Sequence, residues 1–349
     1  MREYLSRVAG NEALRARLGD EIARGAVSHA YILEGPCGSG KHTLAREVAM
    51  ALSCEKRTDG AYPLPCGICP TCRKIREGKS PDVITVSREE GKATMGVDVV
   101  RALRADVPVL PNDLEHKIYV IEDAHTMTTQ AQNALLLTLE EPPPFVMFLL
   151  LTERVDALLE TIRSRAPVLR MQPIGEAQMR EYLCDPARGE TARTARTLAD
   201  TDPDAFAALL RMANGTLGRA NELLEDKKRA PLMARRAQIL ALCEQLGKGT
   251  GQDALLERVL GLGNARDELT ERLLLMKEAL RDLLLLGCTD MAPLLFFTDR
   301  DAAIELAARF SATRLQAILD ATDATLDALS QNANARLTMI HYLCRLTAK

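Results

Sequence analysis

A glycine-rich turn between two apolar segments is the feature that most constrains this chain. The residues GPCGSGKHT occupy positions 35–43; the run HAYILEGP leads into them, and KHTLAREVAMALSC continues from them with a helical pattern. Gly35, Gly40 and Lys41 match the spacing G-x-x-x-x-G-K of a phosphate-binding loop, which normally ends in serine or threonine. Such a loop follows a strand and opens a helix, so the segment predicts a strand, a loop and a helix in that order.

His42 departs from this pattern. In a phosphate-binding loop the backbone N–H groups enclose phosphate oxygens, and the lysine reaches the outer phosphates. A hydroxyl at position 42 would give an oxygen ligand to Mg²⁺, whereas imidazole is a poor substitute and Thr43 is one residue out of register. ATP binding is therefore possible, but Mg²⁺ is expected to be held poorly. The residues expected to contact a nucleotide are Gly35, Gly38, Gly40, Lys41, His42 and Thr43.

Three further apolar runs rich in β-branched residues predict strands. They are DVITVS at 82–87, KIYVIED at 117–123 and FVMFLLLT at 145–152, and a helical pattern follows each one. Strands that alternate with helices indicate a parallel sheet with both faces covered. The sequence thus predicts an α/β domain in which the loop lies at the end of one strand.

Outside these runs the sequence predicts helices. Residues 1–28 have a helical pattern, strand signals stop near residue 171, and the segment 267–287 is apolar on more than one face, as in a buried helix. We expect three parts: an α/β domain at 1–170 with a cysteine-rich insert at about 54–72, a small helical lid domain at 171–226, and an all-α domain at 227–349.

Glu122 and Asp123 end the apolar run at 117–123. A hydrophobic strand that ends in two acids resembles a Walker B element, in which an aspartate lies near Mg²⁺ and a glutamate after it orients water. Here the order is reversed, and a change of one methylene moves a carboxylate by about 1.5 Å, where about 1 Å of misplacement can cost about 10²-fold in rate. Taken alone, the pair could also be a solvated cap between a strand and a helix.

Four of the nine cysteines form a cluster, Cys54, Cys66, Cys69 and Cys72. Thiolates are soft ligands, and four of them without an open position are typical of a structural zinc site. The tight C-x-x-C-x-x-C run is also compatible with an iron–sulfur cluster, although the Cys-Pro that usually follows is missing, and unliganded cysteines are a further alternative. Zinc is the interpretation that we favour.

In chain order, SHAYILEGPCGSGKHTLA, the four-cysteine insert, IYVIEDAHTMTTQAQNALLLTLEEPPPFVMFLLLT and TIRSRA resemble the bacterial clamp-loader ATPases of the AAA+ superfamily. The resemblance covers residues 1 to about 225. It implies a AAA+ P-loop domain with a helical lid, followed by a collar domain that joins subunits. His42 and the reversed acids are similar to the degraded nucleotide motifs of the delta-prime subunits of DNA polymerase III, whereas gamma/tau subunits keep intact motifs.

By the same resemblance, Ser164 and Arg165 lie in a Ser-Arg-Cys motif in which Ala166 replaces the cysteine. The resemblance implies that Arg165 enters the ATP site of a neighbouring subunit as an arginine finger, and a finger supplied in trans can be worth about 10³ to 10⁵ in rate. It also implies a sensor 1 position at Thr152 and a sensor 2 arginine at Arg219. Without the resemblance, the segment TIRSRA could be a buried arginine pair or a solvated basic turn.

The resemblance implies a stator-like subunit of a DNA-replication complex that opens the sliding clamp and loads it on primer–template DNA. Its partners would be gamma/tau and delta subunits, and its own ATPase activity would be weak or absent. An active gamma/tau-type ATPase is the alternative, and a zinc-containing DNA-binding module is a third hypothesis. The net charge of −3 argues against independent DNA binding. Since no apolar run reaches the about 18 residues of a membrane span, we expect a cytoplasmic protein.

Overall fold

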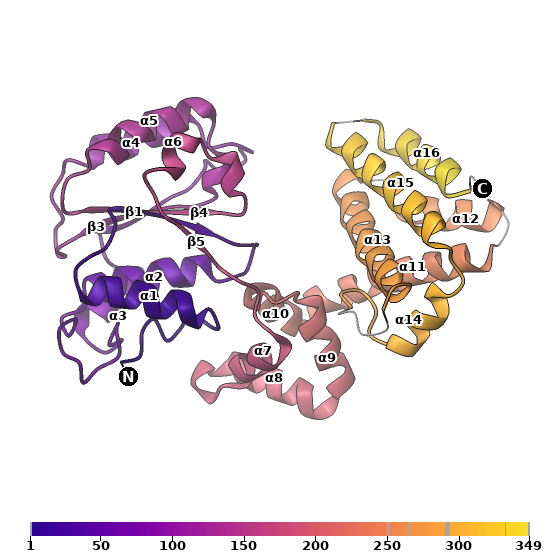
Figure 1. The fold of residues 1–349 in the computed structure, drawn as a ribbon, viewed down its shortest axis with the longest axis horizontal. Helices are drawn as coiled ribbons and strands as arrows, with labels where there is room; N and C mark the ends of the chain where they lie inside the picture. Colours follow the sequence, from indigo (N-terminus) through magenta and orange to yellow (C-terminus); the bar gives the residue numbers. More distant parts are fainter. Residues whose placement is uncertain (1, 250–251, 264, 290–293, 332, 348–349) are drawn as a thin grey trace. The chain divides into compact units, whose positions relative to one another are not determined.

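The computed structural model describes residues 2–249, 252–263, 265–289, 294–331 and 333–347 (Figure 1). The chain divides into two compact units: unit 1 is Met1–Tyr182 with Gly215–Arg219, and unit 2 is Leu183–Asn214 with Ala220–Lys349. Unit 1 contains two hydrophobic clusters, one on each face of a sheet, and unit 2 contains a separate large cluster between helices. The finer division into three parts at 1–170, 171–226 and 227–349 stays a prediction.

Five parallel strands form the sheet of unit 1 in the order β2-β3-β4-β1-β5. β3 and β4 are buried along their whole length, which explains why both have continuous apolar sequences. Glu34 pairs with Thr152 and Ile121 pairs with Leu150, so the carboxyl ends of β1, β3 and β4 lie at one edge of the sheet. The strands are β1 (Ala30–Glu34), β2 (Val83–Val86), β3 (Lys117–Ile121), β4 (Val146–Thr152) and β5 (Val168–Arg170).

Helices cover both faces of this sheet (Figure 1). Leu33 and Leu149 pack with α2 on one face, whereas Ile32 and Leu150 pack with α4 and α5 on the other, as expected for alternating side chains of strands. The first face carries α1 (Glu12–Ala23), α2 (Lys41–Leu52) and α3 (Pro70–Arg76), and the second carries α4 (Val97–Asp106), α5 (Thr129–Glu140) and α6 (Glu160–Arg163). The expected α/β class with a covered parallel sheet is confirmed.

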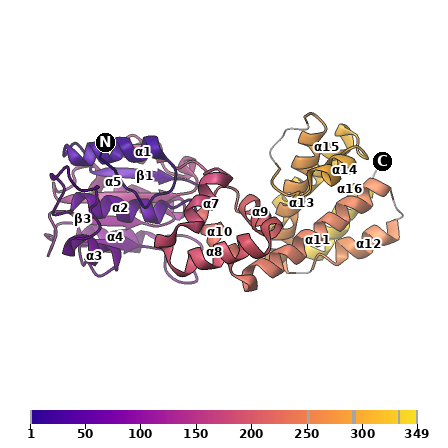
Figure 2. The same ribbon diagram turned by 90° about the horizontal axis from the view of Figure 1, so that it is seen from below.

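The region after the sheet is helical, as expected. α11 and α12 lie side by side (Figure 2), and α13 is buried on several faces, which agrees with the helix expected at 267–287. Within the described residues, no helix has the length and apolar character needed to cross a membrane. The helices are α7 (Glu176–Cys184), α8 (Glu190–Thr201), α9 (Pro203–Met212), α10 (Leu217–Leu224), α11 (Asp226–Lys248), α12 (Gln252–Leu260), α13 (Arg266–Leu286), α14 (Arg300–Ala307), α15 (Ala312–Ser330) and α16 (Ala335–Thr347), with 3₁₀ turns η1 (Ala124–Thr126), η2 (Val155–Ala157) and η3 (Pro186–Arg188).

Two details differ from the expectation. The three-residue strand β5 is not predicted, because it is too short to show a periodic pattern. The expected helix over 1–28 is wrong at its beginning, since only α1 is helical there. The Leu5 N–H donates to the Leu64 carbonyl at 2.8 Å and the Leu64 N–H donates to the Glu3 carbonyl at 2.9 Å, so the first residues pair with the cysteine-rich insert instead.

Asp82, which precedes β2, anchors the loop that leads into β3. Its carboxylate is completely buried and accepts hydrogen bonds from the N–H groups of Asn112 (2.7 Å), Asp113 (2.7 Å) and Leu114 (2.9 Å). Burial acts to raise the pKa of Asp82, but these hydrogen bonds outweigh it, so that the pKa lies below its ordinary value. The stabilisation is therefore present above the unfolded pKa of about 3.9 and is lost as the pH falls through the lower folded pKa.

We expect Asp82→Asn to lower the free energy of unfolding at neutral pH by about 1–3 kcal/mol, because the loop N–H groups lose charged acceptors. The difference from the wild type should shrink as the pH falls below about 4, where Asp82 becomes protonated in the unfolded state, and should vanish once the pH is below the lower pKa of the native carboxylate. Urea unfolding followed by circular dichroism at several pH values measures both effects. Asp113→Asn is the control, since this exposed carboxylate pairs with Lys74 at the surface. Equal urea midpoints for the wild type and Asp82→Asn at neutral pH would contradict the anchoring role.

Candidate functional site

The glycine-rich loop connects the end of β1 to the start of α2 and has the backbone shape of a phosphate-binding loop. Gly38 (φ 75°) and Gly40 (φ 96°) both adopt the left-handed conformation, which residues with a side chain rarely tolerate. Gly40 is the N-cap of α2, so the first N–H groups of this helix lie at the loop. The arrangement can enclose an anion such as a phosphate.

Lys41 is the first residue of α2 and is buried. Its Nζ donates to the carbonyl oxygens of Gly35 at 2.6 Å and Pro36 at 2.9 Å, both within the loop. Burial lowers the pKa of Lys41, whereas the nearby Glu153 and Asp123 act in the opposite direction. The ammonium group of Lys41 thus lies inside the loop, and the carboxylates of Glu153 and Asp123 are close enough to influence its pKa.

His42 and Glu122 meet at the mouth of the loop. The Nε2 atom of His42 lies 2.9 Å from Oε1 of Glu122, and both side chains are partly exposed. Glu122 directly follows β3, and Asp123 after it adopts a left-handed conformation with φ 45°. The structure therefore brings the reversed acidic pair to the residue that replaces the usual hydroxyl. Sequence reasoning singled out both residues but could not predict that they touch.

Thr43 and Thr152 have other surroundings. Consecutive helical residues point about 100° apart around the axis, so Thr43 cannot take the place of a hydroxyl at position 42. Thr152, the last residue of β4, is buried, and its hydroxyl donates to the Arg154 carbonyl at 3.0 Å and accepts from the Arg154 N–H at 3.1 Å. Its own carbonyl accepts from the Gly35 N–H at 3.1 Å, which ties β4 to the loop.

The start of α10 packs directly on the loop. The Gly218 N–H donates to the Gly38 carbonyl at 2.9 Å. A Cβ atom on Gly218 would lie 2.6 Å from the Gly38 Cα atom, and one on Gly38 would lie 3.0 Å from the Arg219 nitrogen. Both positions therefore need glycine for this approach. The backbone of Arg219, the expected sensor 2 residue, lies at the loop, although the two segments are far apart in the sequence.

Arg165 lies apart from the loop, just after α6. Its Nη2 pairs with Oε1 of Glu140 at 2.8 Å, and its Nη1 donates to the Thr161 carbonyl at 3.0 Å. Ser164, the C-cap of α6, donates from its hydroxyl to the same carbonyl at 3.1 Å. Arg165 is partly exposed, so this guanidinium is held at the surface of unit 1 by an acid at the end of α5.

The four cysteines of the insert converge. All four are buried, and their Sγ atoms lie within 4.8 Å of one another. A tetrahedral zinc ion about 2.3 Å from each sulfur would place the sulfurs about 3.8 Å apart, close to the 4.0 Å between Cys66 and Cys72. Cys69 is the N-cap of α3 and accepts from the Cys72 N–H at 3.4 Å, which orients both side chains. The residues fit a structural metal ion.

The pKa values of these thiols differ. Burial acts to raise the pKa of Cys66, but N–H groups of Ile68 and Cys69 and the neighbouring thiols outweigh it and lower the pKa to about 7. Burial raises the pKa of Cys72 and also that of Cys54. One thiol therefore ionises readily near neutral pH, and a bound metal ion would hold the other sulfurs as thiolates.

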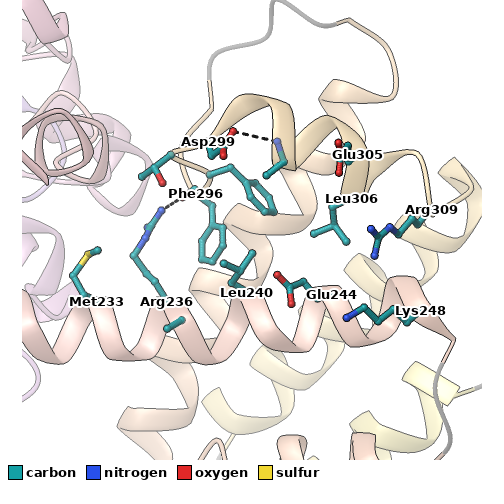
Figure 3. Close-up of a pocket in the computed structure, with 14 residues that line it drawn as sticks. Met233, Arg236, Leu240, Glu244, Lys248, Phe296, Asp299, Glu305, Leu306 and Arg309 are labelled. Carbon is teal, nitrogen blue, oxygen red and sulfur yellow. Dashed lines mark hydrogen bonds between the residues drawn. The ribbon is translucent and has the colours of Figure 1, made fainter. Parts of the chain in front are cut away.

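Unit 2 has an apolar groove of about 430 Å³ between α11 and the segment 296–309 (Figure 3). Arg236 extends from α11 toward this segment; its guanidinium lies 4.4 Å from the centre of the Phe296 ring and donates to the Phe296 carbonyl. Leu240 and Leu306 face the same groove. Sequence reasoning missed this groove. One signal in the sequence could have indicated a lining face of α11. Residues that line the groove recur there every three or four positions: Met233, Arg236, Leu240, Glu244 and Lys248.

Comparisons with known proteins relate parts of this chain to subunits of DNA polymerase III. Residues 10–175 match the family model described as "DNA polymerase III, delta subunit". The tau subunit of DNA polymerase III from Escherichia coli (strain K12) is 33% identical over 219 residues, which cover 63% of this chain and 32% of that protein. The gamma subunit from Buchnera aphidicola subsp. Acyrthosiphon pisum is 30% identical over 223 residues, which cover 64% of this chain and 58% of that protein. The chain thus spans less than two thirds of the length of either relative.

Among solved structures, a gamma subunit-related protein of DNA polymerase III from Thermotoga maritima aligns with a TM-score of 0.46 and 16% identity, over 96% of this chain and 98% of that chain. The DNA clamp loader delta protein of Bacillus subtilis aligns with a TM-score of 0.34 and 14% identity, over 96% of this chain and 99% of that chain. On the sequence matches, this chain is similar over part of its length to subunits of DNA polymerase III.

Proposed function

We propose that this chain is a clamp-loader subunit of DNA polymerase III of the delta-prime type. It acts as a stator in the complex, completes the ATP site of a neighbouring subunit with Arg165, and itself hydrolyses ATP weakly or not at all. The observation that carries the second half of this proposal is the contact between His42 and Glu122 at 2.9 Å. The imidazole of His42, paired with the carboxylate of Glu122, occupies the position at which hydrolysis needs a hydroxyl that binds Mg²⁺.

The loop and the acidic pair support a site that has lost its Mg²⁺ ligands but kept its shape. Lys41 and the left-handed glycines retain the phosphate-binding geometry. Mg²⁺ prefers oxygen ligands in near-octahedral geometry, and His42 offers nitrogen instead. If Mg²⁺·ATP were bound, the ion would neutralise charge on the outer phosphates. His42 and the reversed acidic pair are a poor set of ligands for Mg²⁺. Hydrolysis of ATP by this loop is therefore disfavoured.

Arg165 supports the role toward a neighbour. A guanidinium stabilises the charge that develops on a transferred phosphoryl group, and it has to reach outside its own subunit to do so. Arg165 follows a short helix at the surface of unit 1 and is already paired with one anionic group, Glu140. The partners in this proposal are gamma/tau and delta subunits, and the sliding clamp and primer–template DNA are contacted through the complex in the cytoplasm.

An active ATPase of the gamma/tau type is the second candidate. The curated relatives at 30–33% identity are gamma and tau subunits, and the loop keeps its lysine, Lys41, whose Nζ lies against the loop carbonyls. In this case a water or another side chain would replace the lost ligand of Mg²⁺. The two candidates differ in a single measurable property, the Mg²⁺-dependent turnover of ATP by the isolated chain.

For the cysteine cluster we propose a structural zinc ion held by Cys54, Cys66, Cys69 and Cys72. The four buried thiols surround one point without an open position, which is typical of structural rather than catalytic zinc. An iron–sulfur cluster is the alternative with the same ligands. The ion would fasten α3 to the turn after α2, near the backbone pairing of Leu5 with Leu64.

The finger assignment predicts the effect of Arg165→Ala in the reconstituted clamp-loader complex. DNA-stimulated ATPase activity should fall, because the site that receives the arginine would lose about 10³-fold or more in its rate. Arg165→Lys should rescue little, since lysine cannot form the planar bidentate contact of arginine. Arg163→Ala is the matched control, because Arg163 is an exposed arginine of the same turn. Unchanged ATPase activity in an assembled Arg165→Ala complex would refute the finger.

Turnover of Mg²⁺·ATP by the isolated chain separates the two candidates. The stator proposal predicts a rate close to background for the wild type and for Lys41→Ala alike. The opposite result, robust turnover that Lys41→Ala abolishes, would favour the gamma/tau-type ATPase.

The zinc proposal predicts about one zinc ion per chain by metal analysis and none in Cys69→Ser/Cys72→Ser. Removal of the ion by a chelator should also lower the thermal midpoint, since binding of a structural ion stabilises only the folded state. Cys288→Ser/Cys344→Ser is the control, because both of these cysteines are exposed. A brown preparation that contains iron would identify the cluster alternative.

A further inference from the structure

We propose that His42 and Glu122 together bind a divalent cation that accepts an imidazole ligand more readily than Mg²⁺ does, such as Mn²⁺ or Co²⁺, when a nucleoside triphosphate occupies the loop. The loop then binds the nucleotide complex of this cation in preference to Mg²⁺·ATP. This inference rests on the loop binding a nucleotide, as the proposed function allows. It does not depend on the role of the chain in a clamp loader.

The distance between the two donor atoms fits ligation of one ion. In an octahedral site with metal–ligand distances of about 2.1 Å, two adjacent ligand atoms lie about 3.0 Å apart. The Nε2 atom of His42 and the Oε1 atom of Glu122 are 2.9 Å apart. An ion could therefore be bound by both atoms without a change in their separation.

His42 lies in a helix, and Glu122 is the residue that directly follows a strand. His42 lies in the first turn of α2, immediately after the residue whose Nζ is fixed by two loop carbonyls. The backbone N–H of Glu122 donates to the Val86 carbonyl at 2.9 Å, which extends the pairing of β3 with β2 by one residue. Residues anchored in this way by a helix and by the end of a strand keep their geometry better than residues on a free loop.

The chemistry of the donor set reverses the usual metal preference. Mg²⁺ and Ca²⁺ take oxygen ligands, whereas imidazole suits the first-row transition metals. Affinity of a mixed nitrogen and oxygen site rises from Mn²⁺ toward Co²⁺ and Ni²⁺. Phosphate oxygens of the nucleotide would fill further positions, as they do for metal ions in other phosphate-binding loops.

Neighbouring charges favour a cation at this place. Asp123 follows Glu122, and the charges of Glu153 and Asp123 act on Lys41 and partly offset the lowering of its pKa by burial. The hydroxyl of Thr152 is engaged with Arg154, so it leaves the metal side of the loop to the imidazole and the carboxylates. A divalent ion would offset the repulsion between these carboxylates and the phosphates of a nucleotide.

The test measures binding of a fluorescent, non-hydrolysable ATP analogue to the purified full chain with EDTA, Mg²⁺ or Mn²⁺. We expect Mn²⁺ to lower the Kd by about tenfold relative to Mg²⁺, because Mn²⁺ accepts an imidazole ligand more readily than Mg²⁺ does. In His42→Ser, which restores a hydroxyl, Mg²⁺ should become at least as effective as Mn²⁺. Glu122→Gln should reduce the gain in nucleotide affinity that Mn²⁺ gives, although His42 is still present. The proposal is thus tested by two different variants, in case one of them does not fold.

Direct ligation has its own readout. The electron paramagnetic resonance spectrum of bound Mn²⁺ should show nitrogen coupling in the wild type and lose it in His42→Ser. Controls are His341→Ser, which removes an exposed histidine of unit 2, and Cys37→Ser, which removes the thiol of the loop. Mn²⁺ is the chosen probe because the thiolate cluster favours softer ions.

Two results would overturn the proposal. The first is equal nucleotide affinity in EDTA, Mg²⁺ and Mn²⁺, and the second is no nucleotide binding under any of these conditions. Neither result affects the arginine finger, which is tested in the neighbour's site. Conversely, an inactive finger in the assembled complex would leave a measured preference for Mn²⁺ intact.

Discussion

The parallel register of β1, β3 and β4 is the constraint on which the rest of unit 1 depends. Because these strands pair side by side in one direction, the glycine-rich loop, the acidic pair and Thr152 are placed at one edge of the sheet. A shift of one residue would turn every side chain of a strand to the opposite face. Because the side chains of β3 and β4 are closely packed in two hydrophobic clusters, such a shift would disrupt both clusters, and this opposes it.

Much of this arrangement could be predicted from local sequence. The apolar runs of β2, β3 and β4 identified the strands, and the spacing of glycines and Lys41 identified the loop, because both signals depend on neighbouring residues only. The four cysteines were expected to converge for the same reason, and they do.

Contacts between distant segments could not be predicted. His42 and Glu122 are 80 residues apart, and no sequence pattern links them. Their contact follows from how α2 is packed on the sheet. The approach of Gly218 to Gly38 is a similar case, since glycine in a sequence does not reveal which backbone it will touch. The pairing of Leu5 with Leu64 was missed because a helical pattern at the beginning of the chain competed with it.

The ion pair of Arg165 has a consequence for conformational entropy. A free arginine side chain carries about 2 kcal/mol of rotamer entropy, and Glu140 and the Thr161 carbonyl already restrict these rotamers. An incoming anion would therefore replace Glu140 as the partner of an ordered guanidinium instead of ordering a mobile one. Whether the anion displaces Glu140 would then depend on how much more negative charge it carries than a single carboxylate. In the proposed finger role, Arg165 would thus distinguish a highly charged phosphate group from an ordinary acidic side chain.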